Sequence, residues 1–168
     1  MNYLILLVNT VLGLLLLYSY YFLINKTENS QRLWGRIQKK YRPIYTVSML
    51  LAALGYMLMM YFLVVKVKNN NELMREILVL QIIVILASML WMPLTIRYMK
   101  NKNAIIKSIV ILVLFTVAIA SFGNFFKVSK IIVPKKEKYL KLISILGAFY
   151  LFFHTFVLDF LLWNYNFF

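Results

Sequence analysis

One carboxyl group, that of Asp159, lies deep in an apolar run, between Leu158 and Phe160. An ionisable side chain inside a run of membrane-spanning length is costly to bury and is a candidate functional site by default. Thr155 and Trp163 lie four residues before and after it, so a helix carries all three on one face, which we expect to point inward. The alternative is that Asp159 lies near a membrane edge and only snorkels or caps the helix.

Few other residues suggest chemistry. The single histidine, His154, lies five residues before Asp159, about 140° away around an α-helix, so the two predict no relay. A lone histidine among apolar residues is more typical of packing than of metal binding. We find no Ser-His-Asp order, phosphate-binding glycine loop, HExxH motif or clustered carboxylate pair, and the chain has no cysteine. We therefore expect no enzyme, no metal site and no required cofactor.

The elements that carry these residues are five uncharged stretches, each near or above the roughly 20 residues that a membrane-spanning helix needs. Because lipid offers no water to unpaired backbone groups, helices are the natural form for such runs. Hydrophobic residues make up 63% of the 168, which leaves no room for a separate soluble domain. We predict one domain, residues 1–168, an all-α integral membrane protein built as a five-helix bundle with short basic loops. Its expected spans are 3–24, 44–65, 77–96, 108–126 and 142–165.

The distribution of charge argues for lipid rather than nucleic acid. The formal net charge is +14, but all 19 Lys and Arg lie between the apolar stretches, where such residues set topology and contact anionic headgroups. The two loops on the N-terminal side hold nine of them and the opposite loops ten, so the balance favours neither orientation. We expect a multi-pass membrane protein with termini on opposite faces, in a membrane that the sequence leaves open.

The loops and spans carry further signals. The first loop, the longest, mixes basic and apolar residues and predicts a short interfacial helix with Trp34 at headgroup depth, and Pro43 then marks the next helix start. Pro93 is expected to kink the third span. Small residues in the second, fourth and fifth spans predict closely packed neighbours. They are Ser48, Ala52, Ala53, Gly55, Ala120, Ser144 and Ala148.

Several short motifs, in order along most of the chain, resemble the TspO/translocator-protein family, the tryptophan-rich sensory proteins. Trp91-Met92-Pro93 resembles the family's helix-three motif, in which one residue separates Trp and Pro. The segment 158–166 resembles its helix-five pattern, with Asp159 in place of Asn. Ala53-Leu54-Gly55-Tyr56 and Val128-Ser129 resemble shorter segments of helices two and four.

The resemblance implies a five-helix membrane bundle that binds a hydrophobic ligand, a tetrapyrrole (porphyrin) or a lipid, in connection with transport or stress signalling. Trp91, Pro93, Asp159 and Trp163, with Thr155 on the same face, would line or shape the cavity. Aromatic walls suit a flat apolar ligand, and a few polar groups would orient it. The basic segment 32–42 would cover the cavity and pair with ligand carboxylates. Dimers are common in this family, so a homodimer or a larger membrane complex is a possible assembly.

Two other readings stay open. The chain could be a non-catalytic structural or assembly subunit of a membrane complex, or of a viral or organellar membrane, with its small-residue stripes as docking surfaces. It could also be a proton or ion pathway through Asp159, although no intramembrane cation is evident to pair with that carboxylate. The predicted partners are therefore the lipid bilayer, a hydrophobic small molecule or further protein subunits, and no nucleic acid.

Overall fold

The computed structural model describes residues 1–28, 30–67 and 71–168, and the described part is mostly helical, without strands. Residues 68–70 of the basic second loop lie outside it. Five helices are long and apolar enough to cross a membrane, which confirms the predicted all-α bundle. The long helices are α1 (Asn2–Lys26), α2 (Arg42–Val65), α3 (Asn71–Asn101), α4 (Ala104–Ser129) and α5 (Lys138–Phe153), the last continued by η4 (His154–Trp163) and α6 (Asn164–Phe167).

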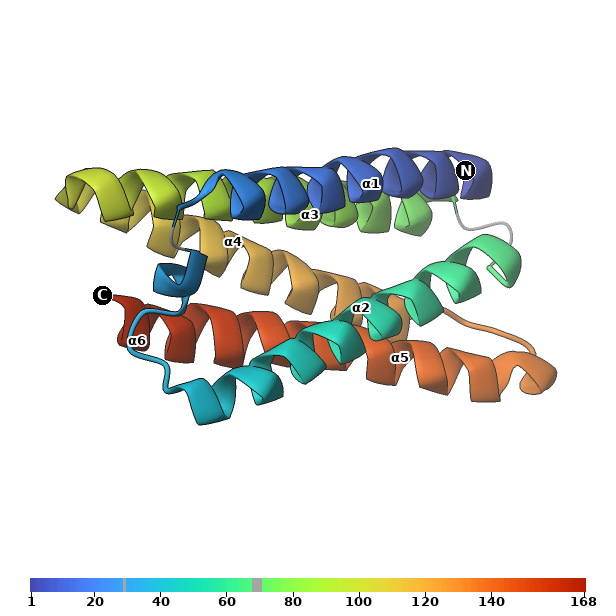
Figure 1. Cartoon of the computed structure of the whole chain (residues 1–168). Coiled ribbons are helices and arrows are strands. Elements are labelled where there is room, and N and C mark those ends of the chain that lie inside the picture. Colours follow the sequence, from blue (N-terminus) through green and yellow to red (C-terminus); the bar gives the residue numbers. More distant parts are fainter. Residues whose placement is uncertain (29, 68–70) are drawn as a thin grey trace.

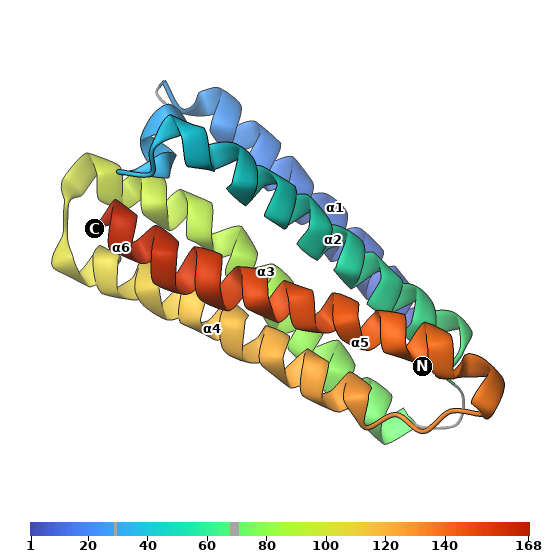
Figure 2. The same cartoon turned by 90° about the horizontal axis from the view of Figure 1, so that it is seen from below.

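The five helices form a ring in the order α1, α2, α5, α4, α3 (Figures 1 and 2). The most extensive packing joins α3 to α4 and α2 to α5, whereas α1 and α2 touch least of the neighbouring pairs. The two termini lie at opposite ends of the bundle. The ring therefore brings the C-terminal segment beside the first loop.

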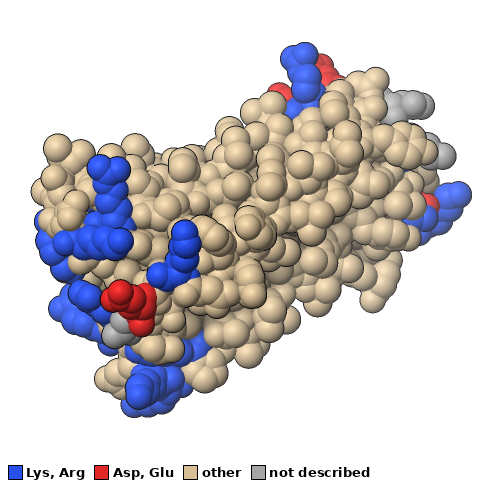
Figure 3. Space-filling view, turned by 45° about the horizontal axis from the view of Figure 1, so that its top comes forward, with Lys and Arg blue, Asp and Glu red and all other residues tan. Residues whose placement is uncertain are grey.

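Lys and Arg gather toward the two ends of the bundle, and a broad uncharged belt separates them on the face seen in Figure 3. On the N-terminal side, Lys127 bonds Glu76 at 2.7 Å and Lys66 lies 3.4 Å from Glu137. The surface of the belt is apolar, with large side chains such as Leu14, whose exposed fraction is 63%.

Glycines in α2 and α5 allow these two helices to cross in backbone contact. A Cβ added at Gly55 would lie 2.6 Å from the carbonyl oxygen of Gly147, and one added at Gly147 would lie 2.5 Å from that of Gly55. Ala52, Ser144 and the neighbouring Ala148 are buried. The expected close packing of small residues in the second and fifth spans is thus confirmed, except that Ala53 is exposed on the outer side of α2.

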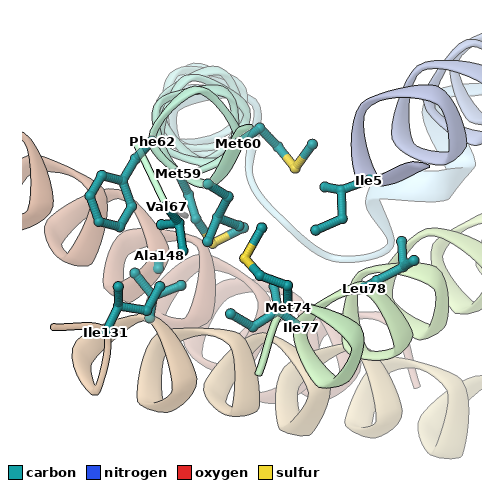
Figure 4. Packing of buried hydrophobic residues seen from close by; sticks show 12 residues of the cluster. Ile5, Met59, Met60, Phe62, Val67, Met74, Ile77, Leu78, Ile131 and Ala148 are labelled. Atoms are coloured by element: carbon teal, nitrogen blue, oxygen red, sulfur yellow. The ribbon is translucent and has the colours of Figure 1, made fainter. Parts of the chain in front are cut away.

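A methionine-rich core fills the bundle near the N-terminal end (Figure 4). Met59 of α2 and Met74 and Ile77 of α3 are almost completely buried there. Ile5 of α1, Ile131 after α4 and Ala148 of α5 pack into the same cluster. Unbranched methionine side chains adapt to irregular gaps between helices, which suits a cluster to which every span contributes residues.

Helix α1 is held to the ring largely by hydrogen bonds. It buries only two residues, Ile5 and Asn9. The Asn9 amide donates to the Gln81 side chain of α3 at 2.9 Å and accepts from the Tyr56 hydroxyl of α2. The Asn2 amide donates to two carbonyls at the end of α2. Gln81 is fully buried, so this polar cluster joins three helices inside the apolar part of the protein.

The first loop differs from the predicted single interfacial helix. It contains two short 3₁₀ helices, η1 (Ser30–Trp34) and η2 (Lys39–Tyr41), separated by Gly35 with a positive φ of 53°. Glycine adopts that conformation without the steric cost of a Cβ, and the change to a positive φ at Gly35 ends η1. Helix α2 begins at Arg42 with Pro43 in its first turn, as expected.

Candidate functional site

A cavity of about 240 Å³ opens at the end of the bundle that holds the C-terminus. Its walls come from α1, η1, the first half of α2, the C-terminal third of α3, and the π-helix η4, including its first residue. Aromatic side chains dominate the lining: Tyr20, Trp34, Tyr45, Trp91 and Trp163. Methionine, aliphatic and hydroxyl side chains complete it, together with His154 and Asp159.

All three tryptophans of the sequence line this cavity. The rings of Trp91 and Trp163 meet edge to face, with centroids 5.2 Å apart, and Tyr20 packs against Trp91 at 6.0 Å. Such edge-to-face pairs are favourable beyond the area they bury, so they fix the shape of the wall. The indole N–H of Trp91 is buried and has no hydrogen-bond partner in the described part of the chain.

Helix η1 covers one side of the cavity and is bound to the C-terminal segment. The Trp163 indole donates to the Leu33 carbonyl at 2.9 Å, and the Arg36 amide donates to the Asn166 carbonyl at 2.8 Å. Gly35 packs so closely on Asn166 and Phe167 that an added Cβ would lie 2.8 Å or less from their backbone atoms. A residue without a side chain is therefore required where the loop meets α6.

The basic residues of this loop do not line the cavity. The Arg36 guanidinium donates to the Tyr165 carbonyl at 3.0 Å. The Arg42 guanidinium donates to the Ile37 carbonyl and the Gln31 side chain and lies over the Trp34 ring. Loop one covers the cavity as the resemblance implies, but through Ser30, Leu33 and Trp34.

His154 and Asp159 meet in the cavity wall. The His154 Nε2 lies 3.5 Å from an Asp159 carboxylate oxygen, and its Nδ1 shares a 3.0 Å hydrogen bond with the Ser48 hydroxyl. Ser48 in turn shares a 3.0 Å hydrogen bond with the Tyr150 hydroxyl. This polar chain runs from the cavity to a second groove between α2 and α5, which Ser48 and Tyr150 line.

The expectation that His154 and Asp159 lie apart is wrong, because residues 154–163 form a π-helix. Hydrogen bonds in a π-helix join residues five apart, so a five-residue spacing returns almost to the same face. An α-helix would separate the two side chains by more than a third of a turn. Such departures from α-helical register are rare and occur frequently at functional sites.

Ser48, His154 and Asp159 are the residue types of a hydrolase triad, but their arrangement differs from one. In that triad the serine bonds Nε2 and the aspartate bonds Nδ1, and here the two contacts are exchanged. Ser48 is buried in the middle of α2, where the backbone N–H groups are used by the helix itself. The arrangement orients the imidazole Nε2 toward Asp159.

The structure brings together three of the five predicted site residues, Trp91, Asp159 and Trp163. Thr155 is buried but outside the lining, and its hydroxyl donates to the Leu151 carbonyl at 3.0 Å. Pro93 is on the outer surface of α3, one residue after Met92 of the wall. Because Trp91 and Met92 take the inward positions, Pro93 cannot line the cavity.

Sequence reasoning missed Tyr20, Tyr45 and His154 as lining residues and placed Trp34 at the headgroups. No spacing rule joins residues from α1, loop one, α2 and η4. One signal was available: three tryptophans and many tyrosines stand at the same ends of the predicted spans, those that a five-span topology gathers on the C-terminal side.

In the part of the chain that the structure describes, no three His, Cys, Asp or Glu side chains gather into a group that could hold a metal ion. Comparison with protein-family models, with curated proteins and with solved structures found no match to this chain.

Proposed function

We propose that this chain is a multi-pass membrane protein that binds a hydrophobic small molecule in the aromatic cavity. Five helices of sufficient length and apolar composition support the membrane setting, as does the uncharged belt between two basic ends. The observation that carries the binding function is the cavity itself, walled by five aromatic side chains from five different elements. Largely apolar pockets with a few placed polar groups are the usual form of small-molecule sites.

The size of the cavity indicates a small ligand or one end of a longer one. Pockets for drug-sized ligands measure about 300 to about 1,000 Å³, and this cavity measures about 240 Å³. One or two aromatic rings, or the end of a lipid, fit such a volume. A whole tetrapyrrole is accommodated only after loop one moves away from the C-terminal segment.

The polar groups of the wall are few and able to orient a ligand. The Asp159 carboxylate offers acceptors to a ligand in the cavity. The two tryptophans that carry the resemblance to the tryptophan-rich sensory proteins, Trp91 and Trp163, are neighbours in this wall. This adjacency supports a receptor or carrier role, in transport or in signalling, over a purely structural one.

Tryptophan fluorescence tests the proposal directly, because every tryptophan of the chain lines the cavity. The purified protein in lipid nanodiscs would be titrated with N-phenyl-1-naphthylamine and with protoporphyrin IX. We expect saturable quenching by the smaller probe, weakened in Trp91→Phe and unchanged in Phe126→Leu, a variant on the outer face of α4. Quenching that never saturates, for either probe, would instead favour the assembly-subunit reading.

A further inference from the structure

The cavity contains a carboxylate without a cationic partner of its own. Asp159 lines the wall with 35% of its side chain accessible, and no Lys or Arg is among the described lining residues. Its one described polar contact is the 3.5 Å approach of His154 Nε2. That separation exceeds the roughly 2.7–3.2 Å of an N–H···O hydrogen bond, so the carboxylate oxygens are open to a further donor.

Four basic side chains at this end of the bundle are engaged with groups other than Asp159. Arg36 donates to carbonyls of the C-terminal segment, and Arg42 donates to loop one. The Lys26 ammonium lies 4.5 Å from the centre of the Phe22 ring, and the Lys107 ammonium lies 5.0 Å from that of Phe168. The structure thus supplies no cation to Asp159 from these four neighbours.

Aromatic rings surround the carboxylate. The negative faces of tryptophan and tyrosine rings attract ammonium groups, and most strongly where water is excluded. Trp34, Trp91 and Trp163, with Tyr20 and Tyr45, enclose the space beside Asp159. A carboxylate together with aromatic faces is the combination that recognises substituted ammonium ions.

We propose that the ligand is a lipophilic organic cation, an apolar body that carries one ammonium group beside Asp159. This inference rests on the proposed function and specifies its ligand class. A carboxylate in a largely apolar wall is poorly solvated, and a bound ammonium would stabilise its charge. A carboxylate ligand would place a second negative charge beside that of Asp159, and this repulsion disfavours an anionic ligand.

The basic loops on this face oppose approach of a cation from the water. Access from the bilayer avoids them. Helices α1 and α2 pack most sparsely in the ring, and both border the cavity through Tyr20 and Tyr45. We therefore expect a lipophilic cation dissolved in the bilayer to enter at this sparsely packed side of the ring.

The test compares benzyltrimethylammonium with neopentylbenzene, in which carbon replaces the nitrogen at the same shape. Both would be titrated into the full-length protein in nanodiscs, with tryptophan fluorescence as the readout. We expect the cation to bind at least about tenfold more tightly, a difference that one ion-paired, ring-enclosed ammonium supplies. In Asp159→Asn the preference should disappear while the affinity for neopentylbenzene is kept, which also shows that the variant is folded.

Equal affinities in the wild-type protein would overturn the cationic ligand and leave the hydrophobic cavity in place. Saturable binding of neither compound, nor of N-phenyl-1-naphthylamine, would overturn the proposed function and this inference together. An unchanged preference for the cation in Asp159→Asn would contradict the role of that carboxylate. The comparison of the two compounds in the wild-type protein decides whether the cavity prefers a cation, even if Asp159→Asn does not fold.

Discussion

The His154 imidazole and the Asp159 carboxylate face each other across 3.5 Å on one side of η4. The contact exists because the helix changes register at His154, so that a five-residue spacing closes a turn. Thr155 lies at this change, and its hydroxyl donates to the Leu151 and Phe152 carbonyls. The register of the last helix thus decides which polar groups reach the cavity.

Ser48 fixes the His154 ring from the other side. Ser48→Ala would leave the buried His154 Nδ1 and the half-buried Tyr150 hydroxyl without their shared partner. We expect a loss of about 1–3 kcal/mol of stability, the cost of unsatisfied buried polar groups, measured by unfolding in detergent. The matched control is Thr116→Ala, which removes a hydroxyl that bonds only its own helix and should change stability by less than about 0.5 kcal/mol. Equal effects of the two variants would contradict the orienting role.

The number and place of the long helices could be predicted from the sequence, because the length of an apolar run and the charges at its ends are local properties. The small residues of α2 and α5 were equally readable, since Gly55 and its neighbours stand at helical spacing. Trp91 and Trp163 entered the site through the resemblance, and both are in the wall.

The rest depended on information that is not local. No proline or glycine within η4 signals the π-helix in the sequence. The α-helical period of 3.6 residues therefore placed His154 on a different face from Asp159. Thr155 was expected in the cavity on the same periodicity. The lining by Tyr20, Trp34 and Tyr45 follows from the order of helices in the ring, which the apolar pattern does not specify.

The crossing of α2 and α5 gives a sharp prediction about glycine. Gly55→Ala and Gly147→Ala each place a Cβ within 2.6 Å of a backbone carbonyl oxygen of the facing helix. Backbone atoms cannot rotate away, so the helices must separate, at an expected cost of about 1–3 kcal/mol. Thermal unfolding in detergent measures this loss.

Two other glycines serve as controls for that crossing. Gly13 has open space around an added Cβ, and Gly13→Ala is expected to stabilise α1 by up to about 1 kcal/mol. Gly123 faces the flexible end of the Leu80 side chain. The stability change in Gly123→Ala should therefore lie between that of Gly13→Ala and those of the two variants at the crossing. A Gly147→Ala protein as stable as the Gly13→Ala protein would show that the close crossing is wrong.

The attachment of α1 through polar groups predicts energetic coupling between Asn9 and Gln81. Asn9→Leu removes the donor to the buried Gln81 side-chain oxygen, and Gln81→Leu removes the acceptor of the Asn9 amide. The loss of stability in the double variant should therefore be smaller than the sum of the two single losses. The expected difference is about 0.6 kcal/mol and at most about 1.7 kcal/mol, the coupling found for hydrogen bonds between membrane helices. A double-mutant cycle in detergent measures the coupling.

A pair that shares no contact provides the reference for this cycle. Asn9→Leu combined with Thr116→Ala, on the outer side of α4, should be additive to within about 0.5 kcal/mol. Additivity of the Asn9 and Gln81 variants to the same degree would mean that their hydrogen bond does not help to hold α1 to α3.

Gly35 determines whether loop one closes the cavity. In Gly35→Ala, the new Cβ would lie 2.7 Å from the Asn166 carbonyl oxygen, in a backbone conformation with φ of 53° that disfavours alanine. We expect η1 to leave the C-terminal segment, which breaks the bond from Trp163 to the Leu33 carbonyl and exposes Trp34. Tryptophan emission should then shift to longer wavelength, and bound N-phenyl-1-naphthylamine should dissociate faster, by up to about tenfold for one lost contact of about 1.4 kcal/mol.

Trp163→Phe should reproduce the faster dissociation because it keeps the ring and removes the donor, while Gly13→Ala should change neither signal. Unaltered emission and dissociation in Gly35→Ala would show that loop one is not the cover of this cavity.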